Sequence, residues 1–592
     1  MTLSRTHFCG QLRTSDVGAA VTICGWVHSY RDHGGVIFID LRDHDGITQV
    51  VFRPDLGQEG YELADRLRHE DVIAVRGRVD VRSGGPNPKL ATGEIEVIVD
   101  HLELLNKSET PPILPDDQVG NVGEEMRLKY RYIDLRRPTM QQIIRTRSRV
   151  MQIMRLHLIE QDFVEIETPI LCKSTPEGAR DFLVPSRMMQ GNFYALPQSP
   201  QILKQILMMS GFDRYFQIVR CFRDEDLRAD RQPEFTQLDV ERAFVTQEDI
   251  FETAEGVFRA VWKGILGVEI GEIPRISYAE SLERFGTDKP DLRFGVELVD
   301  LSDIAAKCDF RVFSGALEKG GCVKAICVPG GGGARGLTRK QTDDMTEWVK
   351  QFGAGGMPLV KITAGGGLET GIAKFLAPIT EELIARMNAK EGDLILFAAD
   401  SHKVACRALG QLRLRVAKEL KLIDTKRWAM AWIVDFPLME WNEDEKRWDP
   451  SHHPFCMPRA EHLHLLESDP GKVIAQTYDF VINGNEMLSG SIRIHRPDVQ
   501  AQIFRMLRIG DEEARMKFGF LLDALKYGAP PHGGFAIGFD RTIMLLCGTD
   551  NIRDVIAFPK TQNGSDLMMS CPSPVDEKQL RELAIRVAPP TK

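Results

Sequence analysis

The chain lacks any apolar run long enough to cross a membrane. No stretch of its 592 residues approaches the roughly 18 consecutive apolar residues that a membrane-spanning helix needs. The N-terminus, Met1-Thr2-Leu3-Ser4-Arg5, also lacks the apolar core of a signal peptide. The eleven cysteines are scattered without a CxxC pair, which favours a reducing compartment over a disulfide-linked scaffold. We therefore expect a cytoplasmic protein with no membrane partner.

The chain also lacks an excess of basic residues. Its 75 Lys and Arg face 85 Asp and Glu, for a net charge of −10. This charge does not indicate a nucleic-acid partner, but it does not exclude one, because phosphate contacts depend on local patches. A chain of 592 residues is too long for one hydrophobic core, so we expect three or four domains.

Residues 1–107 have the pattern of a small β-barrel. Short strands separated by Gly-containing turns are predicted at Val21–Val27, Val36–Leu41, Ile47–Phe52, Val72–Val79 and Ile95–Val99. A helix is predicted near Tyr61–Arg68, between the third and fourth strands. Five strands with this interruption are typical of an OB-fold, a common reader of single-stranded nucleic acid. A barrel that serves only as a spacer is the alternative.

A proline-rich joint and a basic stretch follow the barrel. Pro111-Pro112-Ile113-Leu114-Pro115 predicts an extended linker. The basic stretch is opposed only by Asp134 and comprises Arg127, Lys129, Arg131, Arg136, Arg137, Arg145, Arg147 and Arg149. Two interpretations remain open: a solvated helical face, or a surface that contacts a nucleic-acid backbone.

Two distant segments carry most of the chemical information. The first is a charged loop, Arg223–Pro233, between two predicted strands. On the second of these strands Gln237, Asp239 and Glu241 alternate with apolar or smaller residues, so one strand face is polar. The other segment is Gly538-Phe539-Asp540-Arg541, which opens an apolar stretch. A polar sheet face framed by two distant arginines suits a polyanion and a small polar ligand.

These segments resemble motifs 2 and 3 of the class II aminoacyl-tRNA synthetases, and the first is most like the bacterial-type aspartyl enzymes. Glu165-Ile166-Glu167-Thr168-Pro169 resembles motif 1. Thr175–Asp181 and Gln198–Gln205 resemble the amino-acid-site segments of the family. Five ordered motifs over some 370 residues are far more specific than a single match.

The resemblance implies an α+β multidomain fold. It has an N-terminal OB-fold barrel, a catalytic core built on an antiparallel sheet, and an α/β insertion domain. The boundaries that it implies are residues 1–107 for the anticodon-binding barrel, 108–140 for a hinge, 141–285 and 417–560 for the core, 286–416 for the insertion and 561–592 for a C-terminal extension.

Activation of an amino acid by ATP needs two anions held together and developing charge neutralised. Arginines do this well, because the guanidinium fork matches phosphate geometry. By resemblance, Arg223 and Arg541 are the catalytic residues. The implied ATP-binding set is Arg223, Asp224, Glu225, Gln232, Phe235, Glu486, Gly538, Phe539, Asp540 and Arg541, with Phe235 stacking on adenine.

Asp479 and Glu486 flank Asn483-Gly484, a strong hairpin signal. Facing strands would bring both carboxylates to one end of a sheet. Magnesium needs hard oxygen ligands and keeps several waters, so two carboxylates and phosphates suffice. The family places its Mg²⁺ ligands at these two positions.

The amino-acid pocket of the family has to separate aspartate from asparagine. An arginine paired with the side-chain carboxylate does so, because an amide would leave the buried guanidinium uncompensated. Arg493 and Lys204 match this clamp, while Glu177, Ser199, Gln201, Arg223, Asp239, His452 and His453 complete the implied aspartate site. His452, His453 and Cys456 also carry zinc-ligand chemistry, but their spacing fits no standard structural site.

In the barrel, the resemblance assigns Arg31, Phe38, Gln49 and Glu96 to the anticodon. A lone Phe in an apolar strand is ordinarily a core residue, which is the alternative for Phe38. His33 and Gly84 match members that charge both tRNA(Asp) and tRNA(Asn), because a looser wall at anticodon position 36 admits both.

We therefore expect an aspartate–tRNA ligase that uses ATP and Mg²⁺ and acts on tRNA(Asp) and tRNA(Asn). It is expected to be a homodimer with Pro169 at the two-fold interface. The alternatives are a strictly tRNA(Asp)-specific enzyme, an asparaginyl-type or lysyl-type relative, and a non-catalytic RNA-binding paralogue. The bacterial-type insertion disfavours the asparaginyl type, and Arg493 disfavours the lysyl type. A non-catalytic paralogue is expected to lose Arg223, Glu486 or Arg541, and all three are present.

Overall fold

The computed structural model describes residues 3–117, 122–175, 179–369 and 371–588. It divides into two units, Met1–Arg147 with Asn551–Pro574, and Ser148–Asp550 with Val575–Lys592. No helix within the described residues is long and apolar enough to span a bilayer.

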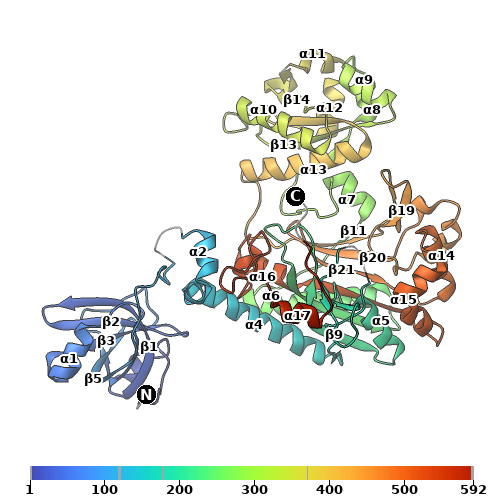
Figure 1. Ribbon diagram of the computed structural model, residues 1–592. Helices are drawn as coiled ribbons and strands as arrows, with labels where there is room; N and C mark the ends of the chain where they lie inside the picture. Colours follow the sequence, from blue (N-terminus) through green and yellow to red (C-terminus); the bar gives the residue numbers. More distant parts are fainter. Residues whose placement is uncertain (1–2, 118–121, 176–178, 370, 589–592) are drawn as a thin grey trace. The chain divides into compact units, whose positions relative to one another are not determined.

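The first unit contains a closed five-stranded barrel with strand order β1-β2-β3-β5-β4 (Figure 1). Its strands are β1 Ala20–His33, β2 Val36–Arg42, β3 Ile47–Phe52, β4 Val72–Val81 and β5 Ile95–Asn106. Helix α1, Gln58–Asp65, lies between β3 and β4 in the chain, as the sequence predicts. Alternate residues such as Ile37, Ile39 and Leu41 of β2 are fully buried inside the barrel. The OB-fold prediction is confirmed.

The central arginines of the basic stretch have partners inside the protein, whereas Lys129, Arg145 and Arg149 are exposed, so the two sequence interpretations stay open for these three. Arg131 is 2% exposed, donates to the carbonyls of Arg553, Ile556 and Ala557, and pairs with Asp134 at 2.5 Å. Arg127 pairs with Asp134 and Asp554. These arginines therefore bind residues 551–574 into the first unit. The stretch spans α2 Glu124–Lys129, α3 Arg131–Asp134 and the start of α4 Pro138–Ile159.

The second unit is built on an eight-stranded sheet of order β11-β17-β20-β21-β22-β10-β9-β6. Only the edge pairs β6–β9 and β11–β17 are parallel among its strand pairs in the described residues. The strands are β6 Val164–Glu165, β9 Arg214–Phe222, β10 Glu234–Ala243, β11 Arg275–Ser277, β17 Met430–Val434, β20 Thr477–Ile482, β21 Asn485–Ile492 and β22 His532–Gly538. The antiparallel core that the family resemblance implies is confirmed.

Helix α6, Gln247–Leu266, packs on one face of this sheet (Figure 1). Thr246 and Asp249 form a capping box at its start, and Gly267 ends it with φ of 69°. Phe258 stacks on Phe480 of β20 with ring centroids 4.6 Å apart. This apolar packing supports the sheet. Strands β10, β20 and β21 of the same sheet carry polar groups that are described below.

The remaining elements of the core are mostly helical. The helices are α5 Gln201–Met209, α7 Tyr278–Phe285, α14 Pro497–Met506, α15 Asp511–Leu525, α16 Phe539–Cys547 and α17 Glu577–Glu582. Two hairpins are formed by β7 Leu183–Pro185 with β8 Phe193–Ala195, and by β18 Met439–Asn442 with β19 Arg447–Pro450. Outside as well as inside the core, short 3-10 helices occur at Thr14–Asp16, Pro54–Leu56, Val349–Phe352, Ala364–Gly366, Ala377–Ile379, Ala460–Leu465, Pro470–Lys472 and Ile552–Asp554.

The insertion between α7 and β17 has its own five-stranded sheet, of order β12-β13-β16-β14-β15. The strands are β12 Leu298–Asp300, β13 Cys322–Val328, β14 Leu359–Ile362, β15 Leu368–Glu369 and β16 Leu394–Asp400. The helices are α8 Ser302–Ala305, α9 Arg311–Glu318, α10 Arg339–Trp348, α11 Ala373–Leu376, α12 Thr380–Met387 and α13 His402–Glu419. Alternate residues of β16 face two separate apolar clusters, so both sheet faces are covered, as in an α/β layer.

Candidate active site

Four charged side chains are buried together at the centre of the core sheet. Lys204 of α5 lies 2.8 Å from Asp239 and 3.2 Å from Glu241, both on β10. Arg493, just after β21, donates to both carboxylate oxygens of Glu241, at 2.9 and 3.2 Å. None of the four side chains is more than 2% exposed. The polar face predicted for this strand is therefore a buried, charge-balanced cluster.

The free donors and acceptors of this cluster show where a ligand can bind. Hydrogen bonds to Glu241, His453 and Ser491 use four of the five N–H groups of Arg493, which leaves one on Nη2. Asp239 Oδ2 is buried and has no hydrogen-bond partner within the described part of the chain. Burial raises the pKa of Asp239 to about 6, although Lys204 opposes this shift. A cationic group beside Oδ2 would satisfy this acceptor.

His453, in the segment that follows β19, contacts the same cluster. His453 Nε2 accepts from Arg493 Nη1 at 2.8 Å, because a guanidinium can only donate. Burial and the neighbouring Arg493 hold the pKa of His453 well below its usual value, so the ring is neutral. His452 is half-buried, with its ring 4.8 Å from that of Phe436 and its Nδ1 3.5 Å from Ser489 Oγ.

Asp479 and Glu486 lie on one face of the predicted hairpin. Strands β20 and β21 pair on either side of Asn483 and Gly484, which have φ of 52° and 79°. Glu486 faces Val481, two residues from Asp479, so both carboxylates project to the same side. Burial and the charge of Glu486 raise the pKa of Asp479 well above its usual value. The pKa of Glu486 is lowered by Lys289 in spite of burial.

These two carboxylates fit a magnesium ion that is shared with phosphates. Asp479 is 4% exposed and its Oδ1 has no hydrogen-bond partner among the described residues. Within the same residues, no group of three or more His, Cys, Asp or Glu side chains is placed to hold a metal by itself. Hard oxygen ligands that are too few to enclose the ion suit Mg²⁺, which keeps waters and substrate phosphates in its shell.

Both motif arginines lie at the charged loop: Arg223 is its first residue, and Arg541 contacts it from α16. Arg541, in the first turn of α16, lies 3.2 Å from Asp230 of the loop and donates to the carbonyl of Glu486 at 2.7 Å. Arg223, just after β9, lies over the ring of Phe235 at 5.1 Å. No described carboxylate forms an ion pair with Arg223. Its guanidinium is therefore available to an anion.

Several predicted ATP-binding residues are placed so that their side chains have internal roles. Phe539 and Asp540 are 0% and 2% exposed, and Asp540 Oδ2 accepts from the backbone N–H of Thr236 at 2.7 Å. The Asp540 side chain thus links α16 to β10. Because the side chains of Phe539 and Asp540 are both buried, these two residues can offer a ligand only their backbone atoms. Gln232 is buried, Glu225 pairs with Arg231 at 3.0 Å, and Asp224 is exposed. Gly538 is the residue before the first turn of α16.

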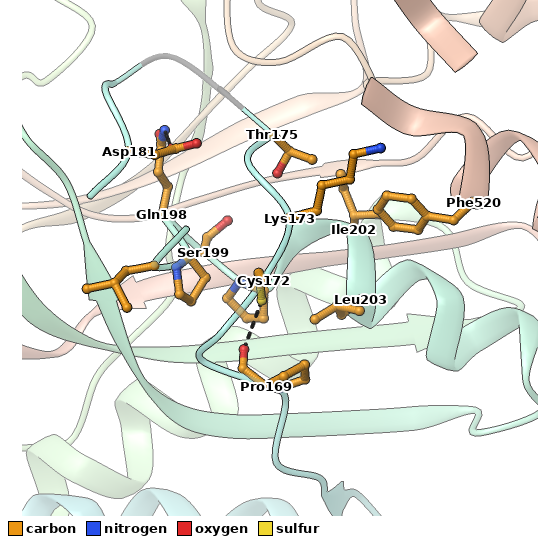
Figure 2. A pocket seen from close by; sticks show the side chains of 13 residues that line it. Pro169, Cys172, Lys173, Thr175, Asp181, Gln198, Ser199, Ile202, Leu203 and Phe520 are labelled. Carbon is orange, nitrogen blue, oxygen red and sulfur yellow. Dashed lines mark hydrogen bonds between the residues drawn. The ribbon is translucent and has the colours of Figure 1, made fainter. Parts of the chain in front are cut away.

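A pocket of about 200 Å³ opens beside the start of α5, and Figure 2 shows its walls. Gln198 and Ser199 line it from the segment before the helix, and Phe520 lines it from α15. Pro169 also lines it, and its carbonyl accepts from Cys172 Sγ at 3.1 Å. Gln201 is buried, with its Nε2 lacking a partner in the described residues. Glu177 lies outside the described residues.

The barrel residues assigned to the anticodon form a second, separate group. Gln49 Nε2 donates to Glu96 Oε2 at 2.8 Å, and both side chains are nearly fully buried. Gln49 Oε1 accepts from Arg82 at 2.7 Å and from Arg31 at 3.3 Å. Arg82 was missed by sequence reasoning, and its Nη1 is buried without a partner in the described part of the chain.

His33 and Phe38 lie side by side on the outside of the barrel. Phe38 is half-buried and alternates with the core residues Ile37 and Ile39, so it is not part of the apolar core. The ring of the exposed His33 meets it edge-on with centroids 6.1 Å apart. Gly84 lies in the loop after β4, where an added Cβ would meet nothing within 4 Å.

Two further residues lie at the core site that the sequence analysis did not assign to it. Glu241 shares a strand face with Asp239, and that alternation was a sufficient signal for it. Lys289 lies 2.7 Å from Glu486, although almost 200 residues separate them. No sequence pattern marks that contact.

The comparisons with known proteins agree with this geometry. The family model described as tRNA synthetases class II (D, K and N) matches residues 123–562, and a model for an OB-fold nucleic acid binding domain matches residues 21–105. The first match covers well over half of the chain, so the chain belongs to the class II tRNA synthetases of the D, K and N group, which are ligases.

Its relatives are named more narrowly. It is 55% identical to the aspartate–tRNA(Asp/Asn) ligase of Geotalea uraniireducens, over 98% of both chains. It is 52% identical to the proteins of the same name from Caldanaerobacter subterraneus, over 99% of this chain and 98% of the other, and from Aquifex aeolicus, over 98% of both.

Solved structures support the fold. The asparaginyl-tRNA synthetase of Pyrococcus horikoshii, complexed with asparaginyl-adenylate, aligns with a TM-score of 0.59 at 18% identity, over 95% of this chain and 99% of that one. A putative aspartyl-tRNA synthetase from Leishmania major aligns with a TM-score of 0.58 at 20% identity, over 94% of both chains.

Proposed function

We propose that this protein is an aspartate–tRNA ligase that activates L-aspartate with ATP and transfers it to tRNA(Asp) and tRNA(Asn). The observation that carries this proposal is the buried cluster of Lys204, Asp239, Glu241 and Arg493. It combines cations for a side-chain carboxylate with an oxygen, Asp239 Oδ2, that has no hydrogen-bond partner among the described residues and can accept from an ammonium. The names of the relatives, at 52–55% identity over the full length, point to the same substrates.

In this proposal the cluster orients the amino acid. The remaining Nη2–H of Arg493 and the ammonium of Lys204 bind the side-chain carboxylate, and Asp239 Oδ2 accepts from the substrate ammonium. Ser199, Gln201 and Glu177 complete the ammonium side, while the neutral His453 and His452 close over the ligand. Asparagine is rejected because its amide would bring no negative charge to two buried cations.

ATP then lies between the two motif arginines. Phe235 stacks on the adenine, with Glu225 and Gln232 at its edge and the Gly538–Asp540 backbone beneath. Arg223 bridges the α-phosphate and the attacking carboxylate, and Arg541 holds the γ-phosphate. The carboxylate oxygen attacks the α-phosphorus and pyrophosphate leaves, so the protein supplies position and charge rather than a nucleophile. The 3′-terminal ribose hydroxyl of tRNA then displaces AMP from the aspartyl carbonyl.

Asp479 and Glu486 would hold Mg²⁺ against the triphosphate. When bound, the ion neutralises charge that develops on the leaving pyrophosphate. The residues of this chain contribute the anionic end of the hairpin, and their fixed position comes from the tight turn at Asn483-Gly484.

The proposed working form is a cytoplasmic homodimer. Pro169 is followed by two exposed apolar residues, Ile170 and Leu171, at 47% and 52% exposure. Other large apolar side chains exposed between residues 156 and 194 are Leu156, Ile159, Val164, Leu183, Met188, Met189, Phe193 and Tyr194. Soluble monomers rarely expose so many in one region, which supports an isologous contact here.

The test is amino-acid-dependent exchange of radiolabelled pyrophosphate into ATP. We expect exchange with L-aspartate, and rates lower by about 10³-fold or more with L-asparagine and L-lysine, because each leaves buried groups unpaired. Equal exchange with asparagine or lysine would overturn the amino-acid assignment. Absence of exchange with every amino acid, in folded protein that still binds tRNA, would instead support the non-catalytic paralogue.

A further inference from the structure

Lys289 lies at the β20–β21 hairpin that carries Asp479 and Glu486, here called the metal hairpin, and has no assigned role there. Its Nζ is 2.7 Å from Glu486 Oε2, and its side chain is 42% exposed. The Lys289 ammonium therefore contacts Glu486, and its side chain is also accessible to solvent. A cation that approaches Glu486 has to compete with this ion pair.

The backbone that carries Lys289 is fixed on its N-terminal side. Gly286 ends α7 with φ of 69° and lies so close to α13 that a Cβ at Gly410 would be 2.6 Å from its carbonyl oxygen. Ser281 donates to the carbonyl of Thr287, and Lys289 N–H donates to Thr287 Oγ1 at 3.2 Å. The segment is therefore held at this end by a close backbone contact and by two hydrogen bonds.

The C-terminal side of the segment is fixed by Arg413 of α13. This guanidinium is 1% exposed and donates to the carbonyls of Asp291, Phe294 and Val296, at 2.8, 3.1 and 3.1 Å. Asp291 in turn packs on the turn of the metal hairpin, where a Cβ at Gly484 would be 3.1 Å from its own Cβ. Arg413 of the insertion domain thus holds the linker beside the hairpin, and the Lys289 side chain extends from this linker with 42% of its surface exposed.

Several acidic groups lie near Lys289 at the hairpin. Asp479 and Glu486 are two carboxylates on one strand face, and Asp288 adds a third charge nearby. Among the described residues, Lys289 is the cation in ion-pair contact with Glu486, while Arg541 uses its Nη1 for the Glu486 carbonyl. When a divalent ion takes the two carboxylates, the ammonium is left without its partner beside an incoming polyphosphate. A lysine is a compact point charge on a flexible stem, suited to move from one anion to the other.

We propose that Lys289 is a nucleoside-triphosphate-binding residue that holds Glu486 before substrate binds and contacts the β- or γ-phosphate afterwards. This inference rests on the proposed function and deepens it. The ammonium competes with the divalent ion for Glu486 when no nucleotide is present, and adds to the affinity once the triphosphate is bound. Two binding constants should therefore change in opposite directions when the charge is removed.

The experiment compares full-length wild type with Lys289→Met, Lys289→Arg and the surface control Lys526→Met. Mn²⁺ binding without nucleotide is measured by electron paramagnetic resonance of the free ion, and ATP binding with Mg²⁺ by equilibrium dialysis. We expect Lys289→Met to bind Mn²⁺ several-fold more tightly and ATP about ten-fold more weakly. Lys289→Arg should retain ATP binding to within about three-fold, and Lys526→Met should match wild type.

Pyrophosphate exchange separates this inference from the proposed function. In Lys289→Met the KM for ATP should rise about ten-fold while the KM for aspartate stays within two-fold. Unchanged ATP affinity, or weaker Mn²⁺ binding, in a folded Lys289→Met variant would overturn the role of Lys289. Wild-type protein without aspartate-dependent exchange would overturn the proposed function, whereas the two binding constants would still decide the role of Lys289.

Discussion

Arg493 and Glu241 are 252 residues apart in the chain and form a two-point ion pair whose side chains are only 2% and 0% exposed. Taking two charges out of water is favourable only when geometry and further hydrogen bonds are nearly complete, and here Ser491 and His453 supply them. The guanidinium is therefore oriented before any substrate arrives. Such preorganisation is what a pocket needs if it is to separate two nearly isosteric amino acids.

Replacement of Arg223 should remove activation without unfolding the protein. Arg223→Ala loses a charge-assisted phosphate contact, so aspartate-dependent pyrophosphate exchange should fall by about 10²-fold or more. Arg220→Ala is the matched control, because that arginine lies three residues earlier and pairs with Glu234 at the surface. The control should stay within about two-fold of wild type. Near-normal exchange in Arg223→Ala would contradict the active-site assignment.

The activity should also depend on the ionisation of Asp239, whose pKa burial raises to about 6. Below that pH the carboxyl is neutral and cannot pair with the substrate ammonium. The kcat/KM for aspartate should therefore fall about ten-fold per pH unit below 6. A flat profile between pH 7 and 5 in wild type, or the same steep limb in Asp239→Asn, would argue against this role.

Titration of Asp239 should lower activity in acid without unfolding the protein. Its folded pKa of about 6 lies above its ordinary value of 3.8, so the folded state holds an extra proton between these values. The contribution of Asp239 to stability is therefore present in acid and is lost as pH rises through 6. Circular dichroism at pH 5 should show an intact fold while activation has dropped.

Dimerisation should depend on the exposed apolar residues next to Pro169. Wild type should scatter light as two chains of 66.7 kDa each at micromolar concentration. Leu171→Glu places a charge in the proposed contact and should shift the protein toward single chains. Val312→Glu is the control, since Val312 is similarly exposed, at 48%, but belongs to the insertion. A wild-type monomer would contradict the dimer proposal.

The choice of tRNA should change at His33 without any effect on activation. His33→Leu alters the exposed ring that meets Phe38, so charging of tRNA(Asn) should fall relative to tRNA(Asp). One altered base-edge contact is worth about 1–3 kcal/mol, which is roughly ten-fold or more in the ratio. Pyrophosphate exchange should stay unchanged in His33→Leu. It should also stay unchanged in the control variant His101→Leu, on β5. Equal loss of both tRNAs would show that His33 supports the barrel instead.

Much of this fold was predictable because its signals are local. The five barrel strands follow from alternation, and the β20–β21 hairpin follows from Asn483-Gly484. The family motifs also place Arg223, Arg541, Lys204 and Arg493 in order along the chain. Arg493 pairs with Glu241 of β10, and Arg541 of α16 pairs with Asp230 of the charged loop.

What the sequence did not indicate depends on contacts between distant segments. Arg131 has the appearance of a solvated or RNA-binding charge, yet it is buried against carbonyls more than 400 residues away. Lys289 reaches Glu486 from the linker between α7 and β12, which Arg413 of α13 contacts. Neither partner is visible in a local pattern, since hydrophobic periodicity and turn chemistry report only neighbours in the chain.

Charging of purified tRNA(Asp) and tRNA(Asn) transcripts with radiolabelled L-aspartate tests the central proposal most directly. The two tRNAs are supplied separately at equal concentration with ATP and Mg²⁺, and a transcript with an unrelated anticodon serves as the control. We predict that both tRNAs accept aspartate and the control does not. Charging of tRNA(Asp) alone would leave a strictly tRNA(Asp)-specific enzyme, and charging of neither would contradict the proposed function itself.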